Sequence, residues 1–145
     1  MDLLSDISGK PRLASIGIRI GAAIIDLLLI WIVGIILGRL FGTPLPRNEG
    51  FGFQLQGWPA LLWFALIFCL MPLQEGLTGK TTGKRLAGIR VVKDDYTTSA
   101  TGASIIRHFF DFVDFFLFVG LIVAATNPKK QRVGDLVAKT LVING

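Results

Sequence analysis

Three stretches of apolar residues, separated by polar segments, organise this chain. The first runs over residues 16–38 and the second over 57–73, where Pro72 predicts the end of the apolar run. At 1.5 Å per residue the first stretch covers about 35 Å, enough to cross a hydrocarbon core of about 30 Å. The pattern therefore predicts two transmembrane helices.

The third stretch, residues 104–126, has a different character. Arg107, His108, Asp111 and Asp114 lie in its first half, and only residues 115–125 are free of charge. Eleven residues cover about 16 Å, which is more typical of a re-entrant or interfacial segment than of a full crossing. A crossing remains the alternative.

Lysine and arginine positions help to choose between these arrangements, since cytoplasmic loops are enriched in both residues. If the third stretch crosses the membrane, seven basic residues lie on one side and six on the other. If it dips in and returns, eleven lie on one side and two on the other. The second arrangement places most basic residues on the side of the N-terminus, which predicts that the N-terminus is cytoplasmic. It also places residues 89–92 and 136–143 on one side, where their β-branched side chains favour a small two-stranded surface sheet.

Composition supports one membrane domain over residues 1–145, an all-α membrane protein apart from that sheet. The chain is 52% apolar and 17% charged, which is too hydrophobic for an ordinary soluble domain, and its net charge of +5 suits anionic lipid. We expect the bilayer as a partner and no nucleic acid. Cys69 is the only cysteine, so a disulfide framework is excluded.

Charged residues inside the apolar stretches are the strongest candidates for function. Arg19 and Asp26 lie seven positions apart, on one helix face and about 10.5 Å apart along its axis. Each would cost about 2.5–3.5 kcal/mol at the centre of a membrane helix, so neither should face lipid. Arg107 and Asp114 repeat the spacing, with Asp111 on the same face, and the two faces together predict a buried charged seam.

Two interpretations of this seam remain open. Buried ion pairs can fix the packing of helices, and a buried carboxylate can also exchange a proton for a cation, as relay carboxylates do in transporters. His108 is interpreted as an interfacial residue. Lys80, Lys84 and Arg85 form a basic loop that we expect to face lipid head groups.

Other kinds of chemistry find little support. The run GLTGKTTGKRLAG lacks the spacing of a phosphate-binding loop, and no nucleophile has a partnered base. One histidine and one cysteine cannot supply the usual ligands of a soft metal. We expect no enzyme, no cofactor and no metal.

Three sequence blocks resemble the RDD family of small prokaryotic membrane proteins. They are RIGAAIID at 19–26, GKTTGKRLAGIRVV at 79–92 and QRVGDLVAKT at 131–140. The family is named for one arginine and two aspartates, which the resemblance places at Arg19, Asp26 and Asp135. Lys139 and Tyr96 depart from the pattern, since the family commonly has a small residue and a turn glycine there.

The resemblance implies a multi-pass protein of the prokaryotic plasma membrane. Cation/proton antiport is attached to a minority of members. We therefore expect a membrane protein that exchanges cations for protons through its Arg/Asp groups, as a homo-oligomer or with a partner membrane protein. The alternative is a non-transporting module that binds a partner protein or anionic lipid, with the ion pairs serving packing.

Overall fold

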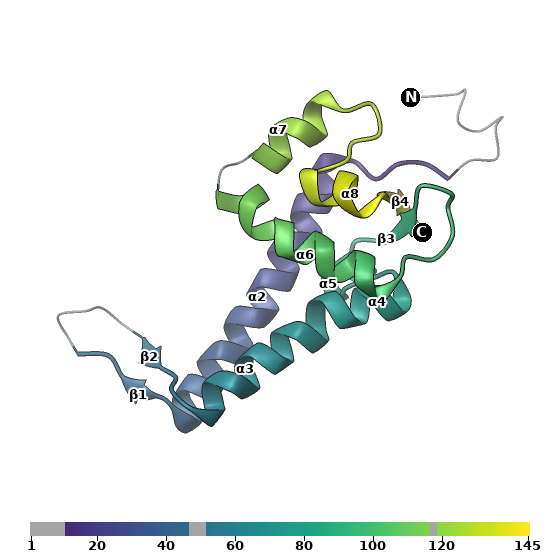
Figure 1. Ribbon diagram of the computed structural model, residues 1–145. Coiled ribbons are helices and arrows are strands. Elements are labelled where there is room, and N and C mark those ends of the chain that lie inside the picture. Colours follow the sequence, from purple (N-terminus) through teal and green to yellow (C-terminus); the bar gives the residue numbers. More distant parts are fainter. Residues whose placement is uncertain (1–10, 47–51, 117–118) are drawn as a thin grey trace.

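A helical hairpin forms the body of the molecule (Figure 1). The computed structural model describes residues 11–46, 52–116 and 119–145, without the side chains at 112–116, 119 and 121. Helix α2 (Ile16–Phe41) is followed by the short strands β1 (Thr43–Pro44) and β2 (Phe53–Gln54), which pair antiparallel at the tip of the hairpin. Helix α3 (Trp58–Phe68) then returns alongside α2.

Apolar side chains cover the outside of this hairpin. Two helices among the described residues, Ile16–Phe41 and Trp58–Thr78, are long and apolar enough to cross a membrane, and 17% of the most apolar stretch of each is buried. Trp31 is 64% exposed and Leu61 is 71% exposed. A surface this apolar is suited to lipid rather than to water, as the sequence predicted.

The second membrane helix is longer than the sequence analysis predicted. Pro72 does not end it, because a π-helical turn, η2 (Cys69–Leu73), absorbs the proline and leads directly into α4 (Gln74–Thr78). Proline lacks the backbone N–H that a regular helix requires, and a local π turn rearranges the bonding there. Residues 74–78, which the sequence analysis left outside the second apolar stretch, therefore belong to the helix, Glu75 among them.

The rest of the chain, residues 79–145, packs against one end of the hairpin, and we call it the cap. It contains short helices and two strands: α5 (Thr82–Leu86), β3 (Ile89–Lys93), α6 (Thr101–Phe116), α7 (Val119–Thr126), α8 (Val133–Ala138) and β4 (Thr140–Asn144). Figure 1 shows the C-terminus and the start of α2 on this side of the molecule.

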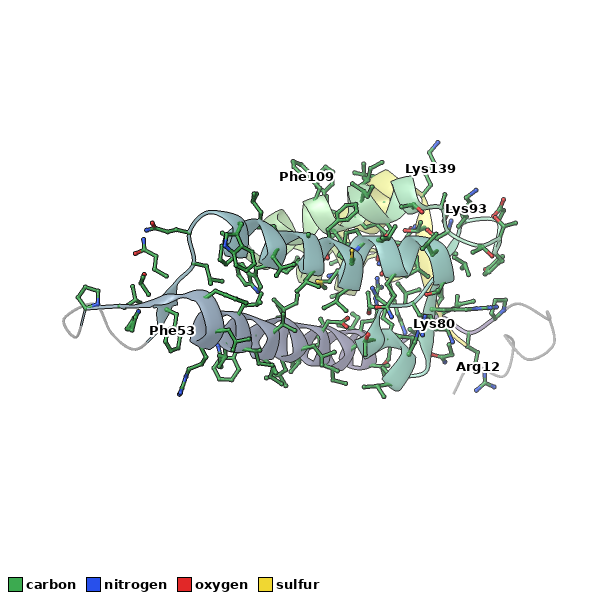
Figure 2. The ribbon with its side chains drawn as sticks, turned by 90° about the horizontal axis from the view of Figure 1, so that it is seen from below. Arg12, Phe53, Lys80, Lys93, Phe109 and Lys139 are labelled. Atoms are coloured by element: carbon green, nitrogen blue, oxygen red, sulfur yellow. The ribbon has the colours of Figure 1, made fainter. Side chains whose placement is uncertain are left out.

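The third apolar stretch contains α6 and α7, which lie before and after residues 117–118, a pair outside the described part of the chain. Neither is long enough to meet the criteria of a membrane-crossing helix, so the structure does not confirm a third span within the described residues. Helix α6 has two distinct faces. Ser104 and Arg107 are buried, whereas Phe109 is 74% exposed and points outward (Figure 2). A helix with its polar face inward is suited to an apolar environment.

The predicted surface sheet is confirmed. Strand β3 pairs antiparallel with β4, with Val91 opposite Val142. The pairing starts later than expected, because α8 takes up the first residues of the predicted strand. Leu13 forms an isolated bridge to Ile143, so the segment before α2 joins the same end of the molecule. The small apolar core lies between this sheet and α2, and it contains Ala14, Ala22, Ile89, Val91 and Val142.

Candidate functional site

Charged side chains are buried where the cap meets the hairpin. Asp26 is 5% exposed, Glu75 0%, Arg107 2% and Asp135 1%. The remaining apolar part of α2, residues 27–41, covers about 22 Å, so a hydrocarbon core of about 30 Å extends beyond Asp26 toward Arg19. In a bilayer, the border between lipid tails and head groups would then fall near Gly21, between Arg19 and Asp26.

Asp26 binds the start of α5. Its carboxylate accepts a hydrogen bond of 2.5 Å from the Thr81 hydroxyl and one of 2.7 Å from the Gly83 N–H. A carboxylate at a helix N-terminus satisfies backbone donors that have no partner within the helix. A Cβ at position 83 would collide with the Ala22 carbonyl and the Asp26 carboxylate, so this contact requires glycine. The motif Thr81-Thr82-Gly83 therefore shelters the deeper aspartate.

Arg19 pairs with Asp135 across the molecule. Its guanidinium also donates to the Lys130 carbonyl, and Arg107 lies on the other side of Asp135, with 3.0 Å between nitrogen and carboxylate oxygen. The sequence analysis placed Arg19 and Asp26 on one face; the structure gives them separate partners. Arg19, Asp26 and Asp135 are thus all buried or nearly so: Asp26 is bound to the start of α5, and Arg19 is bound to Asp135.

Helix α8 holds Asp135 in position. The Asp135 carboxylate accepts a bond of 3.1 Å from the Arg132 backbone N–H, which caps the helix. Gly134 allows the close approach to α6, since a Cβ there would lie 3.0 Å from the Arg107 carbonyl oxygen. Burial raises the pKa of Asp135, but the Arg107 and Arg19 guanidiniums lower it by more, so the pKa lies well below its ordinary value. Asp135 therefore stays ionised.

Glu75 is the residue that the sequence analysis missed. It pairs with Lys84, lies 3.4 Å from an Arg107 nitrogen and accepts a 3.2 Å hydrogen bond from Ser104. Arg107 thus lies between two buried carboxylates, Glu75 and Asp135. Continuing the helical periodicity past Pro72 would have placed Glu75 on the inner face with Met71 and Pro72, and this was the available signal.

The remaining residues of α6 lead outward from the cluster. His108 lies 3.9 Å from Glu75 through Nδ1 and 3.9 Å from Asp111 through Nε2. Asp111 is 34% exposed and lies 3.2 Å from Arg132. The structure brings Arg107 and Asp111 to the site, as the spacing indicated. The side chain of Asp114 lies outside the described residues.

The basic loop is divided between two environments. Lys84 points inward to Glu75 and is 13% exposed, so it does not face the head groups as expected. Arg85 is exposed and donates to the Thr78 hydroxyl, and Lys80 donates to the Gly145 carbonyl. Only Lys80 and Arg85 remain near the surface for a contact with lipid.

A cavity of about 660 Å³ opens beside the charged cluster. Apolar side chains of α2, α3 and η2 form much of its walls. Charged side chains come from α2, α5, α6 and Arg132, the residue before α8. The volume falls in the range of roughly 300–1,000 Å³ of pockets that bind small molecules. Asp26, His108 and Asp111 all border it.

The two departures from the family pattern occupy unusual backbone positions. Tyr96 has φ 65° and Lys139 has φ 52°, both in the left-handed region that glycine adopts most easily. Lys139 ends α8 in this conformation. Glycine is thus the occupant favoured on physical grounds, and this chain adopts the conformation with larger side chains.

Comparison with known proteins confirms the family that the three sequence blocks resemble. The model of the RDD family matches residues 13–139. Neither the curated proteins nor the solved structures contain a match to this chain. The matched region includes both membrane helices and nearly all of the cap, and the chain belongs to the RDD family.

Proposed function

We propose that this chain is a non-transporting module of the prokaryotic plasma membrane, in which the buried ion pairs fasten the cap to the two membrane helices. The observation that carries the proposal is the bonding of the carboxylates. Asp26 accepts from Thr81 and Gly83, and Asp135 lies between two guanidiniums. A relay carboxylate has to lose and regain its partner, whereas these groups have fixed partners within one folded unit.

The module has its cap in the cytoplasm. Basic residues support this orientation, since Arg12, Lys80, Lys93 and Lys139 lie at the cap end of the hairpin and Phe53 lies at the other (Figure 2). This distribution follows the positive-inside rule. Its exposed apolar surface contacts lipid, a second copy or a partner membrane protein, and its basic face contacts anionic head groups.

Cysteine labelling tests the orientation. In a Cys69→Ser background, Gln54→Cys should react with a membrane-impermeant maleimide in intact cells, whereas Lys93→Cys and Asn144→Cys should react only after lysis. The reverse pattern would invert the orientation. Labelling of Asn144→Cys but not Lys93→Cys in intact cells would mean that the third stretch crosses the membrane.

An exchange assay tests the absence of transport. Purified protein in vesicles with an imposed pH gradient should leave the gradient unchanged when Na⁺ or K⁺ is added, as empty vesicles do. Asp26→Asn should lower the amount of folded protein in the membrane, because the buried amide no longer matches the two donors from Thr81 and Gly83. Dissipation by the wild type that Asp26→Asn abolishes at a normal protein level would refute the proposal.

Cation/proton exchange is the second candidate function. One observation favours it: His108 lies between buried Glu75 and half-exposed Asp111, next to a cavity that also reaches Asp26. A histidine in such a place can pass protons between an interior carboxylate and the outside. Two membrane helices do not enclose a pathway by themselves, so this function requires an oligomer or a partner membrane protein.

A further inference from the structure

The cavity beside the charged cluster combines two kinds of wall. Its lining on α2 extends from Ile16 to Leu27, about 16 Å along the helix axis, which is close to the depth of one lipid leaflet. Ile24, Leu27 and Phe64 line it and are at least half exposed. The apolar part of the cavity is therefore accessible from the surface of the hairpin that the bilayer covers.

Cations outnumber carboxylates on the polar lining of the cavity, although Arg19, Lys84 and Arg107 pair with Glu75 or Asp135 outside that lining. Four cationic side chains and two carboxylates line the cavity, while Glu75 and Asp135 are not part of the lining. The lining cations are Arg19, Lys84, Arg107 and Arg132. An occupant with a negative group at one end and an apolar body would therefore match both walls.

Arg132 provides a donor for such an occupant. Its side chain borders the cavity, and its Nε is buried without a hydrogen-bond partner among the described residues. A buried donor without a partner costs free energy, which a phosphate oxygen would recover. Arg132 is also 29% exposed, so a head group can reach it from the membrane surface.

We propose that the cavity binds one anionic glycerophospholipid of the cytoplasmic leaflet, with an acyl chain between α2 and α3 and the phosphate beside Arg132 and Arg19. The inference rests on the membrane placement in the proposed function, and it assigns a specific lipid site in addition to the basic face. From a border near Gly21 to Leu27 the apolar wall covers about 9 Å, which accommodates the part of an acyl chain nearest the head group. The charge of the lining selects an anionic lipid over a zwitterionic one.

Native mass spectrometry of the full chain in detergent tests the site. We expect one adduct when a phosphoglycerol lipid is added, and a weaker signal from a phosphoethanolamine lipid with the same acyl chains. Ala23→Trp should abolish the adduct, because Ala23 lines the cavity. Ala65→Trp is the matched control, since Ala65 is exposed on α3 outside the lining and should leave binding unchanged.

A second variant tests the charge. Arg132→Gln should lower the preference for the anionic lipid about fivefold, because a basic residue near a lipid surface contributes about 1 kcal/mol. It retains the cavity, so it remains informative if circular dichroism shows that Ala23→Trp is unfolded. Equal binding of the two lipids by the wild type, or unchanged binding by both variants, would overturn the proposal. A doubled mass without a lipid adduct would assign the cavity to a second copy instead.

The site and the proposed function fail in different ways. A wild-type protein that stays in the membrane fraction and binds no lipid refutes the lipid site alone. A wild-type protein found outside the membrane fraction refutes the proposed function as well.

Discussion

The two ends of the helical hairpin are stabilised by different interactions. At the β1–β2 end, contacts between the helices are few and apolar: the Phe41 and Trp58 rings lie 4.7 Å apart, and Trp63 packs against Gly34. At the cap end, Glu75, Arg107 and Asp135 are almost completely buried and bound to one another. Lipid satisfies the first end without specific partners, whereas the second depends on matched charges.

The difference shows where sequence should matter most. An exposed leucine in lipid has many acceptable replacements, because acyl chains are as apolar as the side chain. A buried charge has few, because losing one partner leaves the other without compensation. The cap end therefore requires particular residues, whereas the β1–β2 end requires only that its residues be apolar. The following predictions test this difference.

Arg107→Met should have the largest effect. It leaves Glu75 and Asp135 without their shared partner, and breaking a buried ion pair costs about 3–5 kcal/mol. Thermal unfolding in detergent should show a large loss of stability. Leu61→Ala at the other end removes a side chain that is 71% exposed and should change little. Equal losses of thermal stability in Arg107→Met and Leu61→Ala would show that the two ends do not differ in this way.

Gly83→Ala should rank second. The added Cβ collides with α2 at the Ala22 carbonyl, and overpacking costs about 1–3 kcal/mol before any loss of the Asp26 hydrogen bonds. Gly102→Ala is the control, because a Cβ at Gly102 meets nothing within 4 Å. Protein level in the membrane and thermal stability should fall for Gly83→Ala alone. A stable Gly83→Ala protein would mean that α5 does not pack closely on α2.

Acidification should weaken the cap end only at low pH. The pKa of Asp135 is lowered in the folded protein, so its stabilisation is complete above the unfolded pKa of about 3.9 and is lost as pH falls through the folded pKa. The stability difference between the wild type and Asp135→Asn should thus be constant from about pH 7 to 5 and shrink below about pH 4. A difference that already shrinks near pH 6 would show that Asp135 titrates there.

Lys139→Gly should produce the smallest change, and a favourable one. Lys139 has φ 52°, a conformation that costs a non-glycine residue roughly 1 kcal/mol, so glycine should raise the unfolding temperature slightly. Lys93→Gly is the control within strand β3, where glycine should destabilise. A lower unfolding temperature for Lys139→Gly would indicate that the lysine side chain makes a contact that outweighs the strain.

Sequence reasoning succeeded where one physical rule dominates. Apolar length predicted both membrane helices, and β-branched residues predicted the pairing of β3 with β4. It was wrong at Pro72, because a π turn can keep a proline inside a continuous helix. Glu75 was missed as a result. The partners of Asp26 were also beyond its reach, since a turn 55 residues away in the chain supplies the hydroxyl that binds it.

The separation between Arg19 and Asp135 imposes an order on biosynthesis. The two residues are 116 positions apart, so at about 5–20 residues per second the ribosome needs roughly 6–23 s to produce the second after the first. During that interval the first helix must enter the membrane while Arg19 is not yet paired with Asp135. The charge of Arg19 is therefore not neutralised by this pairing until Asp135 has been synthesised, and a chain truncated before Asp135 would lack that partner of Arg19.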